Sequence, residues 1–199
     1  MTQQVITASV WDGAYTYAAY RNRLDELMAD GKTTGPDQSE KMIRYARLNL
    51  QRMNRLEKTV EILPDLREAL NAIRQPQRWL LLTEGWCGDA AQNIPVIAKA
   101  AALNSKIDLR LILRDENPLV MDRYLFHGTR SIPRLIFMDA TFTDLALWGP
   151  RPAAAQQIVY NGKQAGLPHE VWVEQVHAWY ARDKYHSLQH ELTAIIKSL

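Results

Sequence analysis

Apolar and polar positions divide the chain into three blocks, and the first, to about residue 57, has helical spacing. A tyrosine-rich stretch ends at Gly31, and the turn residues 33–37 follow it. Ser39 is a residue type that caps helices. After it, apolar side chains recur at the spacing of a helix that faces a core, at Ile43, Ala46, Leu50 and Met53. The block is therefore predicted to be helical.

The second block alternates strand-like and helix-like segments. Pro64 is suited to the first turn of a helix, and apolar strands are expected at 79–83 and 107–113. A helical pattern lies between these two strands. Two more strand candidates, 134–138 and 145–148, are joined by turn residues and predict a hairpin. This order predicts an α/β sheet with right-handed connections.

The third block is helical again. Its apolar positions fit two helices whose phases do not join across 182–186, so we expect a break there. Trp172 and Trp179 share one face of the first of these helices, which is more typical of core packing than of a ligand platform. The remaining core positions that we expect are Val176, Tyr180, Leu188, Leu192, Ile195 and Ile196.

Composition limits the classes of partner. A chain of 199 residues with 47% hydrophobic residues and a net charge of +2 fits one domain with extensions. That charge is too small to indicate nucleic acid or an anionic membrane as an obligatory partner. The first seven residues lack the basic and apolar regions of a secretory signal. One cysteine excludes an intramolecular disulfide and favours a reducing compartment, so we expect a cytoplasmic protein.

Two further patterns give weak signals. His186 and His190 have the spacing of two ligands on one helix face, but no third ligand stands out, and we expect no metal. Polar side chains also form a stripe on the helix after Ser39, which is more typical of a solvated face than of an anion- or partner-binding surface. The stripe consists of Arg44, Arg47, Gln51, Arg55 and Lys58.

The single cysteine, Cys87, lies where an apolar strand gives way to a helical pattern. The free backbone N–H groups at a helix N-terminus stabilise a thiolate and lower a thiol pKa. The carboxylate of Asp89 opposes this effect by like-charge repulsion. The two effects are of similar size, so the sequence leaves the sign of the pKa shift open.

The run Trp86-Cys87-Gly88-Asp89-Ala90 resembles the Trp-Cys-Gly-Pro-Cys motif of the thioredoxin superfamily. Pro95 matches a helix-kinking proline that thioredoxins often carry at this spacing. The run Arg130-Ser131-Ile132-Pro133-Arg134 resembles the family's loop with a cis-proline that faces the thiol, and Gly149 matches a glycine beside the active-site groove. The resemblance covers about residues 60–165.

Three positions depart from the family pattern. Ala90 replaces the resolving cysteine, and Leu81 replaces a buried aspartate that helps to move that thiol's proton. The usual lysine neighbour of this aspartate falls on Leu111. Loss of the thiol together with its proton relay implies that the chain is not a dithiol reductase.

The resemblance implies a thioredoxin-like α/β fold, with a mixed central sheet flanked by helices. We expect a core over 58–165, with helical extensions at 1–57 and 166–199 packed on it. The extensions have apolar stripes that need burial, and neither is large enough for a good core of its own.

For function, the resemblance implies a partly exposed Cys87 that works as a monothiol and needs no cofactor. It would exchange with a low-molecular-weight thiol or a partner protein disulfide, and an outside thiol would resolve the product. The alternative is a redox-inactive module that binds a peptide or partner protein in the same groove. Arg134 could attract a carboxylate there or be solvated. The predicted groove consists of Trp86, Gly88, Asp89, Ala90, Ser131, Ile132, Pro133 and Gly149.

Overall fold

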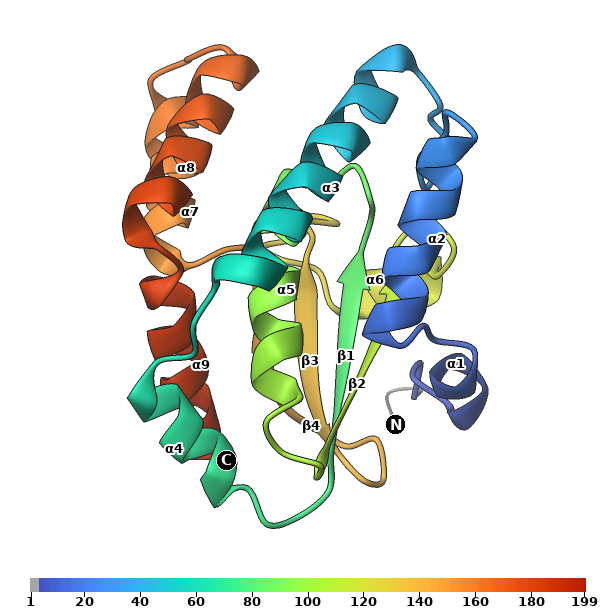
Figure 1. Ribbon diagram of the computed structural model, residues 1–199, viewed down its shortest axis with the longest axis vertical. Coiled ribbons are helices and arrows are strands. Elements are labelled where there is room, and N and C mark those ends of the chain that lie inside the picture. Colours follow the sequence, from blue (N-terminus) through green and yellow to red (C-terminus); the bar gives the residue numbers. More distant parts are fainter. Residues whose placement is uncertain (1–3) are drawn as a thin grey trace.

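The computed structural model describes residues 4–199, and its centre is a four-stranded mixed sheet (Figure 1). The strand order is β2-β1-β3-β4; β1 pairs with β2 in parallel, whereas the β1–β3 and β3–β4 pairs are antiparallel. The strands are β1 (Gln77–Thr83), β2 (Ile107–Leu113), β3 (Arg134–Asp139) and β4 (Asp144–Trp148). The predicted mixed sheet and its hairpin are confirmed.

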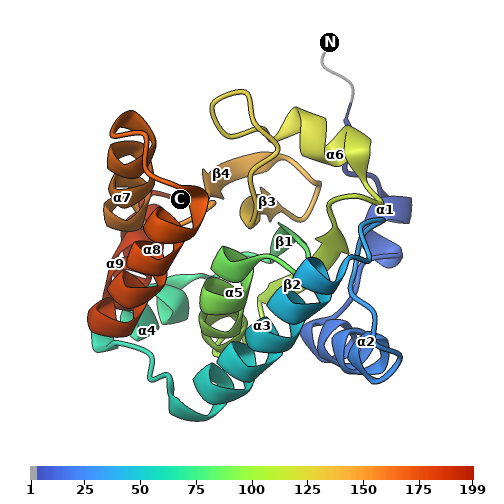
Figure 2. The same cartoon turned by 90° about the horizontal axis from the view of Figure 1, so that it is seen from above.

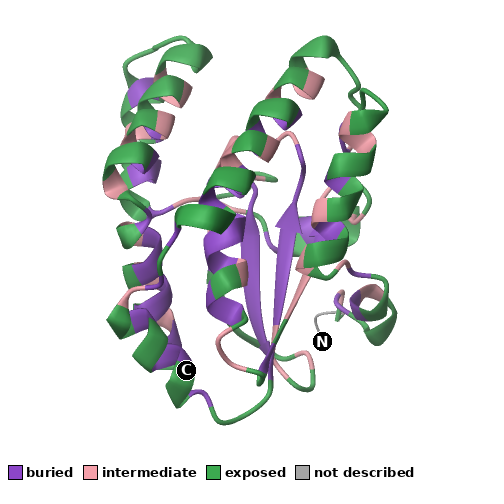
Figure 3. Ribbon diagram, viewed as in Figure 1, coloured by how far each residue is buried: buried purple, intermediate pink, exposed green. Residues whose placement is uncertain are grey.

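Helices cover both faces of this sheet. They are α1 (Ala8–Asp12), α2 (Tyr17–Ala29), α3 (Glu40–Thr59), α4 (Pro64–Ala72), α5 (Gly88–Ala101), α6 (Pro118–Arg123), α7 (Ala153–Gln164), α8 (His169–Asp183) and α9 (His186–Ser198). Figure 2 shows α5 on one side of the sheet and α6 with α1 on the other. The central strands β1 and β3 are buried along almost their whole length (Figure 3), which explains their unbroken apolar runs.

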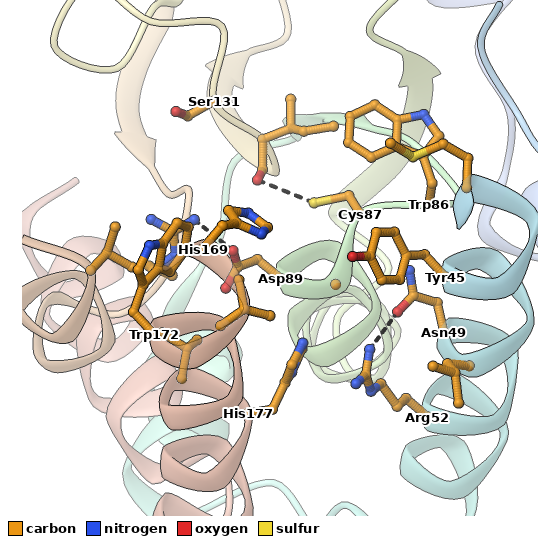
Figure 4. Close-up of a pocket in the computed structure, with 18 of the residues that line it drawn as sticks. Tyr45, Asn49, Arg52, Trp86, Cys87, Asp89, Ser131, His169, Trp172 and His177 are labelled. Atoms are coloured by element: carbon orange, nitrogen blue, oxygen red, sulfur yellow. Dashed lines mark hydrogen bonds and ion pairs between the residues drawn. The ribbon is translucent and has the colours of Figure 1, made fainter. Parts of the chain in front are cut away.

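The flanking helices pack on neighbouring elements of the central part of the chain. α3 lies against α5, α9 lies against α4, and α7 packs on α8. Buried side chains from Ile6 to Ile196 belong to one continuous hydrophobic cluster. As a result, α3 and α8 stand on either side of the N-terminal end of α5, where Cys87 lies (Figures 1 and 4).

Several helix boundaries follow from local chemistry. Ser39 caps α3 by accepting the backbone N–H of Met42, as its residue type predicts. The expected break between α8 and α9 occurs at Lys184 and Tyr185, which both have left-handed backbone conformations. The helix α7 was not expected, because its alanine- and glutamine-rich sequence has only a weak apolar pattern.

Among residues 4–199, no helix is long and apolar enough to cross a membrane. The N-terminal run in which we expect no secretory signal begins with residues 1–3, which lie outside the described part of the chain.

Candidate functional site

Cys87 is the N-cap residue of α5, directly after the turn that leaves β1. Its Sγ accepts the backbone N–H of Ala90 at 3.5 Å, and its S–H donates to the backbone carbonyl of Ile132 at 3.4 Å (Figure 4). The residue is only 8% exposed, so the expectation of a partly exposed thiol is wrong. The Ile132 loop covers the sulfur from one side, and α3 and α8, which come from the two ends of the chain, enclose the space in front of it.

The surroundings of Cys87 determine whether its thiol pKa is raised or lowered, which the sequence leaves open. Burial, reinforced by the negative charge of Asp89, raises the pKa of the Cys87 thiol from 9.0 to about 12. The backbone N–H of Ala90 and the positive charge of Arg151 oppose this rise without cancelling it. At neutral pH, Cys87 is therefore a thiol that donates a hydrogen bond, and only a very small fraction of it is thiolate.

Asp89 belongs to a buried ion pair. Arg151 donates to its Oδ2 through Nε at 3.0 Å and through Nη2 at 2.6 Å, and Tyr180 donates to its Oδ1 at 2.9 Å. The side chains of Asp89 and Arg151 are only 15% and 14% exposed. This network ties the first turn of α5 to α8 and to the segment before α7. Arg151 was not predicted, because no local pattern marks a partner so distant in sequence.

The loop of Pro133 packs closely against Gly149. The Ile132–Pro133 peptide bond is cis, and so is the bond between Gly149 and Pro150. A Cβ atom on Gly149 would lie 2.2 Å from the carbonyl oxygen of Pro133, and the φ of Gly149 is +108°. Only glycine fits this position without a shift of backbone.

Arg134 has a structural role. Its guanidinium is buried and donates to the backbone carbonyls of Tyr124 and Gly149. Neither of the two roles that we considered for it, attraction of a carboxylate in the groove or exposure to solvent, is therefore correct.

A cavity of about 440 Å³ opens in front of Cys87, between α3, α8 and the Ile132 loop (Figure 4). Five of the predicted groove residues line it together with Cys87, namely Trp86, Gly88, Asp89, Ser131 and Ile132. Ala90, Pro133 and Gly149 are not among the lining residues. Much of the remaining wall was not predicted and comes from the helices on either side, as Tyr45, Leu48, Asn49, Arg52, Trp172, Val176 and His177.

Trp172 illustrates the difference between the sequence pattern and the structure. It packs against Gly162 of α7, in keeping with a core position, but it is only partly buried and forms part of the cavity wall. Trp86 also lies in the wall, with the guanidinium of Arg114 4.7 Å from its ring centroid. Two indole rings therefore face the cavity, which suits contact with an apolar ligand.

This arrangement of strand, capping cysteine, helix and cis-proline loop matches a known family. The sequence matches the family model described as thioredoxin over residues 35–167. The chain belongs to the thioredoxin family. No curated protein matches it.

Two solved structures share the fold. A protein of unknown function from Pseudomonas aeruginosa is 19% identical, with a TM-score of 0.61 over 96% of this chain and 98% of that one. An HIV epitope scaffold is 20% identical, with the same TM-score and the same coverage of both chains. At these identities the likeness shows the fold alone.

This thioredoxin-family chain has no polar group at the two positions where the resemblance places a proton relay. Leu81 and Leu111 are register partners on β1 and β2, and both are fully buried. The apolar pair leaves no acid or amine there to move a proton. Within residues 4–199, no group of three histidine, cysteine or acidic side chains is placed to hold a metal ion.

His177, on α8, is held in a defined tautomer by a chain of hydrogen bonds. Arg55 donates to the hydroxyl of Tyr185, and Tyr185 donates to Oε1 of Gln92. The Gln92 amide nitrogen is then the donor to Nδ1 of His177, at 3.2 Å. The proton of neutral His177 therefore lies on Nε2, which has no hydrogen-bond partner among residues 4–199, and His177 lines the cavity.

The lowered pKa of His177 predicts how the stability of the protein varies with pH. Burial, together with the nearby Arg52, lowers the pKa of His177 from 6.5 to about 4. The unfolded chain therefore takes up this proton at a higher pH than the folded chain. The contribution of neutral His177 to stability is complete above pH 6.5 and is lost as the pH falls through about 4.

As the pH falls from 6.5 to about 4, we expect the free energy of unfolding of His177→Gln to decrease less than that of the wild type. Urea unfolding at a series of pH values measures the difference. His190→Gln, which changes an exposed histidine, is the control and should follow the wild type. Parallel curves for the wild type and His177→Gln would contradict the assignment.

Proposed function

We propose that this thioredoxin-family chain is a binding module that uses the cavity beside Cys87 without redox chemistry. The observation that carries the proposal is the state of the thiol, which burial and Asp89 keep protonated at neutral pH. Thiol–disulfide exchange starts from the thiolate, so a thiol with a pKa of about 12 is a poor nucleophile.

The thiol has a different role in this proposal. Its S–H donates to the carbonyl of Ile132, and its Sγ accepts the N–H of Ala90, so it links the cis-proline loop to the N-terminus of α5. The volume of the cavity lies within the range of small-molecule sites, about 300–1,000 Å³. Its wall is largely apolar, with a few polar groups that can orient a ligand.

Monothiol exchange is the second candidate, and it is favoured by the position of Cys87 at a helix N-terminus on the cavity wall. In that reaction the Cys87 proton leaves to solvent, and the thiolate attacks one sulfur of a disulfide. A new bond to Cys87 forms while the old sulfur–sulfur bond breaks, and the other sulfur leaves as a thiolate. Ala90 cannot resolve the product, so a low-molecular-weight thiol or a partner protein thiol would have to release it.

The rate of mixed-disulfide formation distinguishes the two candidates. We expect Cys87 to react with oxidised glutathione at pH 7 at least about tenfold more slowly than N-acetylcysteine does, because so little of it is thiolate. Mass spectrometry of the adduct over time gives the rate, and Cys87→Ser gives the background. A rate above that of the free thiol would establish the exchange reaction in place of the binding module.

A further inference from the structure

One arginine of the cavity wall has no carboxylate partner. Four arginines line the cavity, and three of them are paired: Arg114 with Asp115 at 2.8 Å, Arg130 with Asp122 at 2.7 Å and Arg151 with Asp89 at 2.6 Å. Within residues 4–199, no carboxylate lies within 4.0 Å of the Arg52 guanidinium. Its hydrogen bond to a side chain goes from Nη1 to the neutral Oδ1 of Asn49, at 2.7 Å.

Arg52 carries its unpaired positive charge in a partly buried position beside a second arginine. Burial lowers the pKa of Arg52, and the neighbouring Arg55 lowers it further, so the site disfavours a positive charge that nothing compensates. Asn49 is itself fixed, because its Nδ2 donates to the carbonyl of Gly85 at 3.0 Å. The guanidinium is thus held in place by a neutral partner. Its other N–H groups have no acceptor in the described part of the chain and can donate to a ligand in the cavity.

His177 supplies a second donor at the same place. A Cβ atom on Gly88 would lie 2.9 Å from Cε1 of His177 and 3.7 Å from Nη1 of Arg52, so both side chains converge on the first residue of α5. Figure 4 shows them reaching this point from α8 and α3. The Nε2–H of His177, the Arg52 guanidinium and the helix N-terminus all favour a negative charge there.

The nearby carboxylate of Asp89 does not fill this position. Asp89 carries the opposite charge to Arg52, but both of its oxygens are already bound by Arg151 and Tyr180. The buried pair with Arg151 offsets part of the negative charge of Asp89 at the first turn of α5.

Apolar side chains from both helices also line the cavity. Tyr45 of α3 and Trp172 of α8 lie on the two sides of the cavity, and Val176 and Ile132 also line it. We propose that the cavity binds an organic acid whose carboxylate meets Arg52 and His177 and whose apolar body lies between Tyr45 and Trp172. This proposal rests on the proposed binding function and names its ligand class. A free acid and the C-terminal carboxylate of a peptide share this chemistry.

Calorimetric titration with matched pairs of acids and amides tests the ligand class. The acids are octanoate, phenylacetate and hydrocinnamate, and the controls are octanamide, phenylacetamide and hydrocinnamamide. We expect at least one acid to bind at least about tenfold more tightly than its amide, because a charge-assisted hydrogen bond is lost in the amide. Equal binding of every pair, or binding of neither member of any pair, would overturn the proposal.

Variants of α3 test whether Arg52 is the residue that binds the carboxylate of the acid. Arg52→Gln is expected to weaken binding of the acid by about ten- to a hundredfold and to leave binding of the amide unchanged. Arg52→Lys should retain part of the preference for the acid. Arg47→Gln is the matched control, because Arg47 is exposed on the same helix and does not line this cavity. An equal loss for acid and amide in Arg52→Gln would indicate a structural role for Arg52 and would overturn the assignment.

Two further arms complete the test. A short peptide that ends in phenylalanine, with a free or an amidated C-terminus, distinguishes a peptide carboxylate from a free acid, and either source supports the proposal if the carboxylate is required. The exchange rate of Cys87 is measured separately. Fast exchange would refute the non-redox function, whereas slow exchange without acid binding would refute only the ligand class.

Discussion

Replacement of Arg151 with leucine is expected to lower the free energy of unfolding by about 3–5 kcal/mol. The substitution leaves the Asp89 carboxylate, which is only 15% exposed, with Tyr180 as its one side-chain partner. Loss of one partner from a buried pair is costly because the other charge stays in a medium that solvates it poorly. Urea unfolding at pH 7 measures the loss.

An exposed pair of the same chemistry provides the control. Arg130 and Asp122 make two hydrogen bonds of 2.7 Å, but their side chains are 55% and 48% exposed. Arg130→Leu should therefore cost less than about 1 kcal/mol. The double variant Arg151→Leu with Asp89→Asn should recover part of the loss, since the buried charge is gone. Equal losses for Arg151→Leu and Arg130→Leu would contradict the role of burial.

Alkylation of Cys87 at pH 7 is expected to be slower by at least about a thousandfold in the folded protein than in urea. The reason is the rise of the thiol pKa from 9.0 to about 12, which reduces the thiolate fraction at pH 7 by three powers of ten. Burial of the sulfur slows the reaction further. Iodoacetamide labelling followed by mass spectrometry gives both rates, because the chain has one cysteine.

Asp89→Asn is the informative variant for this reaction. It removes the negative charge that, after burial, contributes most to the raised pKa of Cys87, so labelling of the folded protein should accelerate. Its unfolded chain should react at the rate of the unfolded wild type. A folded wild type that is labelled within tenfold of the unfolded rate would contradict the account of the thiol.

The features that could be predicted from the sequence are those that neighbouring residues determine. The strand before Cys87 contains the apolar run 79–82, and the cysteine lies between that run and a helical pattern, so the junction was predictable. Ser39 determines a helix start by its own hydroxyl, and the order of strands and helices determines the sheet class. The resemblance added the cis-proline loop at Pro133, which no local pattern identifies.

The features that could not be predicted depend on residues far apart in the chain. The cavity in front of Cys87 lies between α3 and α8, and neither helix falls within residues 60–165, where the sequence motifs resemble the family. Arg52 is one of four arginines in α3, and only the fold distinguishes it from the other three, which are exposed. Arg151 and His177 likewise reach α5 through tertiary packing. The character of the site therefore follows from the elements around the thioredoxin-like motif.

Direct titration of Cys87 tests the central claim most sharply, because it separates the pKa of the thiol from its accessibility. The Cβ chemical shift of Cys87, followed by NMR as the pH rises, reports ionisation of this one group. The account predicts no transition near pH 9.0 in the folded protein, with ionisation either near pH 12 or together with alkaline unfolding. A midpoint at or below 9.0 in the folded protein would contradict it.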